Sequence, residues 1–150
     1  MVNPFDPKTV LLAKHAQHVV LVHFPIALFI TGVGFDFAGQ WMKKPVLAVV
    51  ARYNLMIAAA ATLPVVATGL LAWQWQLEGH KLKGILLQHL VLGAVSSALI
   101  WMVWWVHFRA SRKAGGMLPA YRLPLEFVTV LAVAVTAHLG GFLSGVNVPG

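Results

Sequence analysis

The sequence contains no cysteine and very few acidic residues. Its 150 residues include only 4 aspartates and glutamates, against 11 lysines and arginines. Without cysteine the chain forms no disulfide, no thiolate metal site and no iron–sulfur cluster, and haem is not attached to it covalently as in c-type cytochromes. The sequence also offers no pair of carboxylates for acid–base catalysis, no nucleophile motif and no glycine-rich phosphate loop. These absences argue against the common classes of soluble enzyme.

Charged residues of both signs are scarce, and apolar residues fill their place. Only 10% of the chain is charged and 59% is hydrophobic, whereas about a quarter of a soluble domain is charged. Four apolar runs cover residues 19–38, 46–72, 84–107 and 124–146, and each has about the 20 residues that a membrane span needs. We therefore predict an all-α, integral membrane four-helix up-down bundle, with residues 1–150 forming one domain. No internal repeat is apparent.

The basic residues indicate how this bundle is oriented. With four spans, both termini and the loop between the second and third runs lie on one side of the membrane. That side carries four basic residues, and the other carries seven: Lys8, Lys14, Lys81 and Lys83 against Lys43, Lys44, Arg52, Arg109, Arg112, Lys113 and Arg122. The positive-inside rule then predicts that both termini are on the outer, periplasmic side. The net charge of +7 is explained by these flanking residues, so we expect no nucleic-acid partner.

Three of the seven histidines lie at similar depth in the predicted outer half of the membrane. His23 and His89 each lie about 5 residues inside their runs, about 7–8 Å below the outer boundary, and His138 is slightly deeper. An imidazole in hydrocarbon needs a partner, and helical bundles hold cofactors with ligands from facing helices. Because the first and third helices of an up-down bundle are diagonal, we predict that His23 and His89 are the axial ligands of haem b.

Small residues share helix faces with these histidines. Gly93 follows His89 by four positions, and Gly141 follows His138 by three. Such residues allow close helix packing, but they also leave room for a flat macrocycle beside the histidines. Both interpretations remain open at this level.

The number of haems and the identity of the cofactor are also open. His138 is expected either to bond a haem propionate or to ligate a second haem together with His18 or His15. One alternative to haem is zinc or copper bound by histidines. However, carboxylates are expected around such a site, and the outer half offers only Asp6 and Glu78, outside the spans. The other alternative is a cofactor-free structural or accessory subunit whose histidines are hydrogen-bonded within the bundle.

Two further acids, Asp36 and Glu126, lie near the opposite ends of the spans. A lone carboxylate in a membrane span is costly. We therefore expect both acids to pair with Arg52 or Arg122, and a proton path through Asp36 is a secondary alternative.

The stretch "HVVLVHFPIALFITGVGFDF" at residues 18–37 resembles the N-terminal signature of the bacterial membrane family called domain of unknown function 2231. That signature has a histidine, a hydrophobic stretch, then "HFPIAL" and a downstream "FD". Here these correspond to His18, residues 23–28, and Phe35 with Asp36. The proline that usually follows the first histidine is Val19 in this chain.

The resemblance extends over nearly the whole chain. His89 is similar to the family's histidine early in the third span, and "GGFLSGVNV" near the C-terminus is similar to a slightly longer ending in the family. The resemblance implies four spans in a bacterial inner membrane, surrounded by lipid. It also implies partners: a periplasmic c-type cytochrome and other subunits of a respiratory complex. We therefore expect a b-type cytochrome-like electron-transfer subunit that is non-catalytic.

Overall fold

The computed structural model describes residues 16–76, 81–113 and 118–145, and the secondary structure in these ranges is helical. The helices are α2 (Ala16–Trp41), α3 (Pro45–Gln76), α4 (Gly84–Ser111) and α5 (Arg122–Leu143). Each is long and apolar enough to cross a membrane, which confirms the prediction of an all-α chain with four candidate spans. Several residues named in the sequence analysis lie outside the described ranges: Asp6, Lys8, Lys14, His15 and Glu78.

The observed helix ends differ from the predicted ones by a few residues, for local reasons. α2 and α3 are joined by a short turn in which Lys43 has a φ of 52°, and the Lys44 amide donates to the Gly39 carbonyl at 3.0 Å. Proline then occupies the first position of α3, where its missing N–H costs nothing. α5 ends at Leu143 rather than near residue 146, because Gly145 adopts a φ of +79°, the left-handed conformation typical of helix ends.

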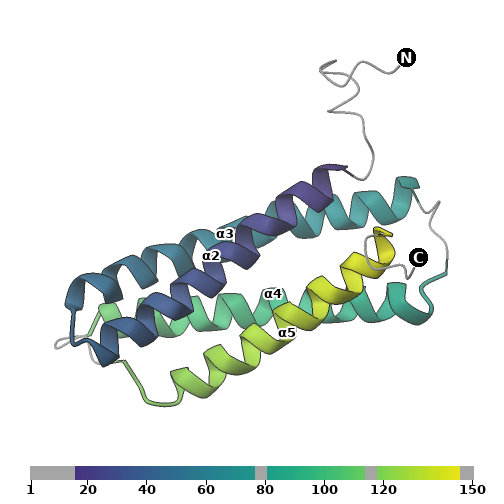
Figure 1. Ribbon diagram of the computed structural model, residues 1–150. Helices are drawn as coiled ribbons and strands as arrows, with labels where there is room; N and C mark the ends of the chain where they lie inside the picture. Colours follow the sequence, from purple (N-terminus) through teal and green to yellow (C-terminus); the bar gives the residue numbers. More distant parts are fainter. Residues whose placement is uncertain (1–15, 77–80, 114–117, 146–150) are drawn as a thin grey trace.

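The four helices form an up-down bundle (Figure 1). α2 packs mainly against α3 and α4 against α5; α3 also contacts α4, whereas α2 meets α5 over only a short stretch. α2 and α4 are therefore diagonal, as the sequence predicted. We call the end where α2 begins and α5 finishes the terminal end. The end where α2 turns into α3 is the loop end.

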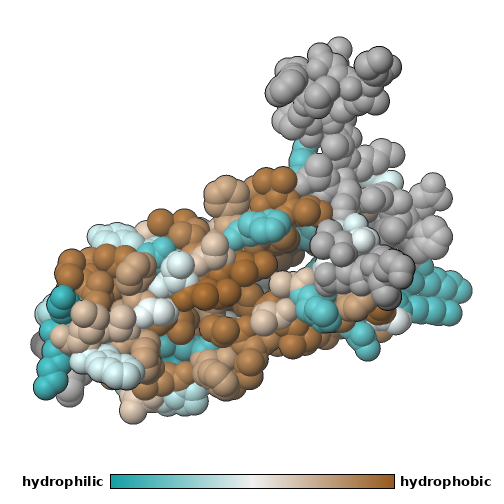
Figure 2. Space-filling model, viewed as in Figure 1, coloured by the Kyte–Doolittle hydropathy of each residue, from teal (hydrophilic) through white to brown (hydrophobic). Residues whose placement is uncertain are grey.

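Large apolar side chains are exposed along the outside of all four helices. Examples are Phe24, Leu63, Met102 and Phe127, each more than half exposed. Figure 2 shows hydrophobic residues over most of the middle of the visible face and hydrophilic residues gathered toward both ends. This distribution suits helices whose outer faces contact lipid.

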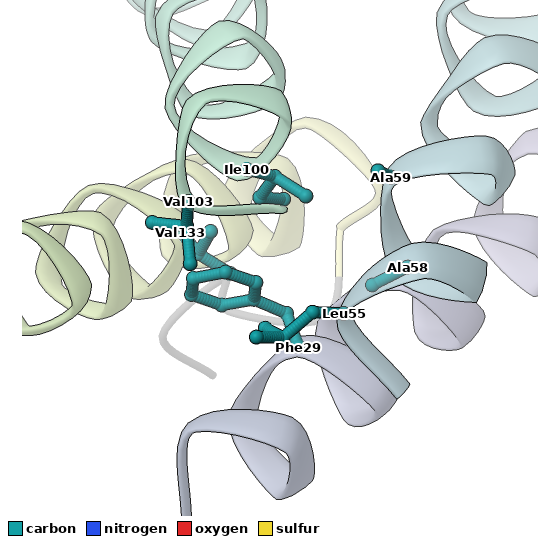
Figure 3. Packing of buried hydrophobic residues seen from close by; sticks show 7 residues of the cluster. All are labelled: Phe29, Leu55, Ala58, Ala59, Ile100, Val103 and Val133. Carbon is teal, nitrogen blue, oxygen red and sulfur yellow. The ribbon is translucent and has the colours of Figure 1, made fainter. Parts of the chain in front are cut away.

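The apolar core lies in the middle of the bundle and extends toward the loop end. Phe29 is fully buried and packs among side chains from all four helices (Figure 3). The cluster comprises Phe29, Leu55, Ala58, Ala59, Ile100, Val103 and Val133. Toward the terminal end, no described residue of α4 before Ser96 and none of α5 after Val133 is buried. Ala72 of α3 is buried there, so among the described residues the terminal half buries fewer side chains than the rest of the bundle.

The two helical hairpins repeat each other, although the sequence shows no obvious repeat. Every buried residue of α4 follows a buried residue of α2 by 71 positions, as 96 follows 25. In α2 these residues are Pro25, Phe29, Gly32, Asp36 and Gly39, and in α4 they are Ser96, Ile100, Val103, His107 and Ala110. The buried residues of α5, which are Arg122, Glu126, Thr129 and Val133, follow Ala51, Leu55, Ala58 and Thr62 of α3 by the same interval. The two hairpins therefore share one burial register, the pattern of a parallel repeat.

Candidate functional site

Two histidines meet across the bundle near the terminal end. His18 from α2 and His89 from α4 are equivalent positions of the two hairpins. Their ring centroids are 6.5 Å apart, and the ring planes are nearly perpendicular at 84°. Because α2 and α4 are diagonal, the two rings face each other near the axis of the bundle.

Each of these rings is held by the neighbouring helix through its Nδ1 atom. His18 Nδ1 lies 3.1 Å from the Val65 carbonyl oxygen and 3.3 Å from Thr68 Oγ1 on α3. His89 Nδ1 lies 3.1 Å from the Thr136 carbonyl oxygen on α5. A carbonyl can only accept, so Nδ1 carries the proton and donates. This tautomer makes Nε2 the nitrogen that binds a metal, and histidine ligands are commonly oriented in this way.

A glycine on the neighbouring helix makes room for each ring. A Cβ atom at Gly69 would lie 2.9 Å from His18 Cε1, and one at Gly140 would lie 3.0 Å from His89 Cε1. Any larger residue would push the imidazole away. Sequence reasoning missed both glycines. The signal that could have revealed them is a histidine-to-glycine spacing of 51 residues that occurs twice, from 18 to 69 and from 89 to 140.

The glycines that the sequence analysis selected lie elsewhere on these helices. A Cβ atom at Gly93 would meet Thr136 Cγ2 at 3.9 Å, an ordinary contact distance. Gly141 is half-buried and follows Gly140, the residue that contacts His89. Their predicted role in binding a cofactor stays a prediction.

The other two predicted ligands lie at the surface of the bundle. His23 is exposed, and its Nδ1 lies 2.7 Å from the Val19 carbonyl of its own helix. His138 is also exposed, with its ring edge-on to Phe142 at 5.0 Å between centroids. The structure thus brings His18, rather than His23, next to His89.

A second polar cluster is buried near the loop end, at the level of Asp36 and its counterpart His107. Arg122 Nε donates to Asp36 Oδ2 at 2.9 Å, and both side chains are almost fully buried, which confirms the expected pairing of Asp36 with an arginine. Arg122 Nη1 donates to the Pro119 carbonyl at 3.3 Å. When the Gln40 amide is turned so that its oxygen faces Arg122, that oxygen accepts from Nη1 at 2.9 Å.

Glu126 does not pair with an arginine, so this expectation was wrong. Its Oε1 lies 2.7 Å from His107 Nε2, while Oε2 is buried and has no hydrogen-bond partner among the described residues. Arg52 instead lies over the ring of its neighbour Tyr53. The sequence did not reveal the His107–Glu126 pair, because the two residues are 19 positions apart on helices whose relative rotation periodicity alone does not set.

Side-chain atoms of Asp36, His107 and Glu126 that could ligate an ion all lie within 4.8 Å of one another. The Asp36 and His107 sites are 18 residues beyond His18 and His89 on their helices. At the α-helical rise, that places the loop-end cluster about 27 Å from the histidine pair. The bundle therefore has two separate polar centres, near opposite ends.

Comparisons with known proteins give the family of the chain. No curated protein matches it, and no solved structure does. A family model described as "Predicted membrane protein (DUF2231)" matches residues 14–147, a range that includes all four helices and both polar centres. The chain therefore belongs to this family of membrane proteins, the one that the "HFPIAL" stretch resembles.

Proposed function

We propose that the chain binds one haem b between His18 and His89 and serves as an electron-transfer subunit in the membrane. The observation that carries the proposal is the geometry of this histidine pair. The pair differs from the one proposed from the sequence in a single ligand, His18 in place of His23.

The separation of the two rings suits an iron atom between them. A metal-bound imidazole nitrogen lies about 2 Å from the metal, and the ring centre lies about 1.2 Å further away, so two imidazoles on opposite sides of one ion have centroids about 6.4 Å apart. The observed distance is 6.5 Å. Direct contacts between rings span about 4.5–7 Å, so this pair is at the wide end of that range.

The surroundings of the pair also fit a macrocycle. The helices at this level bury few side chains of their own, since burial begins only at Ser96 in α4 and stops at Val133 in α5. The glycines at positions 69 and 140 let each imidazole lie close against the neighbouring helix. Two histidines anchored on diagonal helices, at a level with few buried side chains, are a suitable frame for a bundle-bound haem.

The residues of this chain would orient and insulate the group rather than react with it. The Val65 and Thr136 carbonyls accept from the two Nδ1–H groups, which leaves Nε2 of each ring as the unprotonated ligand nitrogen and increases its basicity. When bound, the haem supplies reversible one-electron chemistry, and two imidazole ligands leave no open position for oxygen. The site therefore suits electron transfer rather than oxygen activation.

The location of the pair suggests the partners. The loop end carries more basic residues than the terminal end, so we place it in the cytoplasm and the histidine pair near the outer face of a bacterial inner membrane. A periplasmic c-type cytochrome and other subunits of a respiratory complex are the partners that fit this position.

Absorption spectra of the purified membrane protein, oxidised and reduced, test the proposal. We expect a low-spin haem b spectrum that is lost in His18→Ala and in His89→Ala. It should persist in His23→Ala and in His107→Ala, which are matched controls at the surface and at the loop end. Loss in His23→Ala with retention in His18→Ala would restore the pair proposed from the sequence.

The same preparation distinguishes the two alternatives. Zinc or copper at one ion per chain, lost in His18→Ala and His89→Ala, would show a histidine metal site instead of haem. A preparation without haem or metal from its native membrane would contradict electron transfer, and a structural or accessory subunit would then account for the fold.

A further inference from the structure

The loop-end cluster buries four ionisable side chains whose charges do not balance. Asp36 and Glu126 are 1% exposed, and His107 and Arg122 are 3% exposed. With both carboxylates ionised, arginine charged and histidine neutral, the cluster has a net charge of −1. An uncompensated buried charge is costly. One additional proton makes the cluster neutral.

The place for this proton is the bond between His107 and Glu126. The distance of 2.7 Å between Nε2 and Oε1 is typical of a charge-assisted hydrogen bond. Glu126 Oε2 is buried without a partner among the described residues, so this carboxylate is only half satisfied. We infer that His107 and Glu126 form a proton-binding site, in which one proton is taken up from the loop-end side of the membrane. The bound proton converts the pair either to imidazolium and carboxylate or to imidazole and carboxylic acid.

A cavity connects this cluster to the loop-end surface. It has a volume of ≈ 290 Å³, and its lining includes the buried Asp36 and Arg122 together with the exposed Gln40, Lys43 and Lys44. This is far more than the roughly 10–15 Å³ that one water needs. Water in the cavity can therefore bring protons to Asp36, whose carboxylate lies within 4.8 Å of ligand atoms of the pair.

The charged groups that face the pair come from three of the four helices. α2 contributes Asp36, α4 contributes His107, and α5 contributes Arg122 and Glu126. The residues of α3 buried at this level, Ala51 and Leu55, are apolar. Arg122 is already bonded to Asp36, so their opposite charges offset each other. The remaining negative charge of the cluster then lies on the His107–Glu126 pair.

A divalent metal fits this cluster less well than a proton. A 2+ ion would leave a net charge of +1, beside the fixed positive charge of Arg122. One Asp36 oxygen is occupied by that arginine, and His107 Nε2 is occupied by Glu126. Three donors are also fewer than the four ligands of a structural zinc site.

Infrared spectroscopy of the intact protein in lipid nanodiscs tests this site without altering it. The sequence contains only two glutamates, Glu78 and Glu126. Labelling with 13C-glutamate in a Glu78→Gln background therefore marks Glu126 alone. Between mildly acidic and alkaline pH, we expect either a protonated-carboxyl band or a shifted carboxylate band from the label. An unchanged Glu126 band across this range would overturn the proposal.

Proton counting gives a second, independent measurement. Potentiometric titration should show that Glu126→Gln takes up one proton per chain fewer than the unaltered protein. Glu126→Leu, which introduces the residue found at the equivalent position 55, should show the same loss, and Lys113→Ala should show none. Equal uptake by all four proteins would contradict the site. Stoichiometric bound metal that disappears in Glu126→Gln would replace the proton by a metal ion. The haem spectrum should not change in any variant, because the two centres are about 27 Å apart.

Discussion

Each end of the bundle combines equivalent positions of the two hairpins, but the two ends differ in packing and in charge. Four buried ionisable groups lie near the loop end, next to the central apolar core, whereas the terminal half holds two half-buried histidines and few other buried side chains among the described residues. The core and buried ion pair indicate that the loop half supplies most of the stability of the fold. The terminal half keeps two anchored imidazoles where packing alone would favour apolar side chains, which is the pattern of a ligand site.

The largest effect should follow from breaking the buried ion pair. Asp36→Ala leaves the Arg122 guanidinium buried without its carboxylate, which costs about 3–5 kcal/mol of unfolding free energy. Denaturant or thermal unfolding in detergent measures this loss. The exposed Lys113→Ala at the same end should change stability by less than about 0.5 kcal/mol.

A double variant sharpens this test. Replacing both members, as in Asp36→Leu with Arg122→Leu, removes the unpaired charge and should recover most of the stability. Loss of haem in Asp36→Ala without loss of stability would show that this charge belongs to the terminal-end site. The loop-end cluster and the histidine pair would then not be independent of each other.

Truncation of the core should have the next largest effect. Phe29 is fully buried among residues of all four helices, so Phe29→Ala should cost about 3 kcal/mol through the cavity that it leaves. Phe24 lies five residues earlier on the same helix and is 57% exposed, so Phe24→Ala should cost less than about 0.5 kcal/mol. Equal losses of unfolding free energy in the two variants would show that Phe24 contributes to packing as much as Phe29 does.

Glycine substitutions at the terminal end should affect ligand binding more than stability. In Gly140→Ala the new Cβ displaces the His89 ring, which weakens its bond to Thr136. We expect haem affinity to fall about tenfold, as for other supports of a metal ligand, while unfolding changes by less than about 1 kcal/mol. The haem-to-protein ratio during dilution measures the affinity. Gly34→Ala, where nothing lies within 4 Å of the added atom, serves as the control, and equal losses in both would contradict the role of Gly140.

The smallest effect is expected for His23. Its ring is exposed and bonds only to Val19 among the described residues. His23→Ala should therefore leave the absorption spectrum unchanged and change the unfolding free energy by less than about 0.5 kcal/mol. Paired spectra and melting curves check this. A spectral change there, with His18→Ala unaffected, would move the axial ligand back to the surface of α2.

The architecture could be predicted from the sequence because it depends on long apolar runs. Four such runs and short connections leave few arrangements other than an up-down bundle, and the diagonal relation of α2 and α4 follows from that order. The pairing of Asp36 with an arginine was also predictable, because a buried carboxylate requires a cation, but the sequence left both Arg52 and Arg122 as candidates.

The contacts around the histidines could not be predicted in the same way. Depth along a helix follows from residue number, but the direction of a side chain depends on how the helix is rotated against its neighbours. His18 and His23 are five residues apart, which is about 500° of rotation, so they point in different directions and only one faces α4. From the sequence His23 was chosen because it lies inside the predicted span at the depth of His89, whereas His18 precedes that span. In the structure, the rotation of α2 places His18 beside His89 instead.

The 71-residue repeat has a consequence for how such a bundle can evolve. If a single hairpin formed a symmetric dimer, each residue next to the twofold axis would lie opposite the same residue of the other copy. Two imidazoles in that position can share one ion, but two carboxylates at the level of Asp36 would repel each other. Joining the hairpins in one chain removes this constraint, because position 36 can then be acidic while position 107 is a histidine. The covalent link thus allows one end of the molecule to remain symmetric while the other acquires charges of opposite kind.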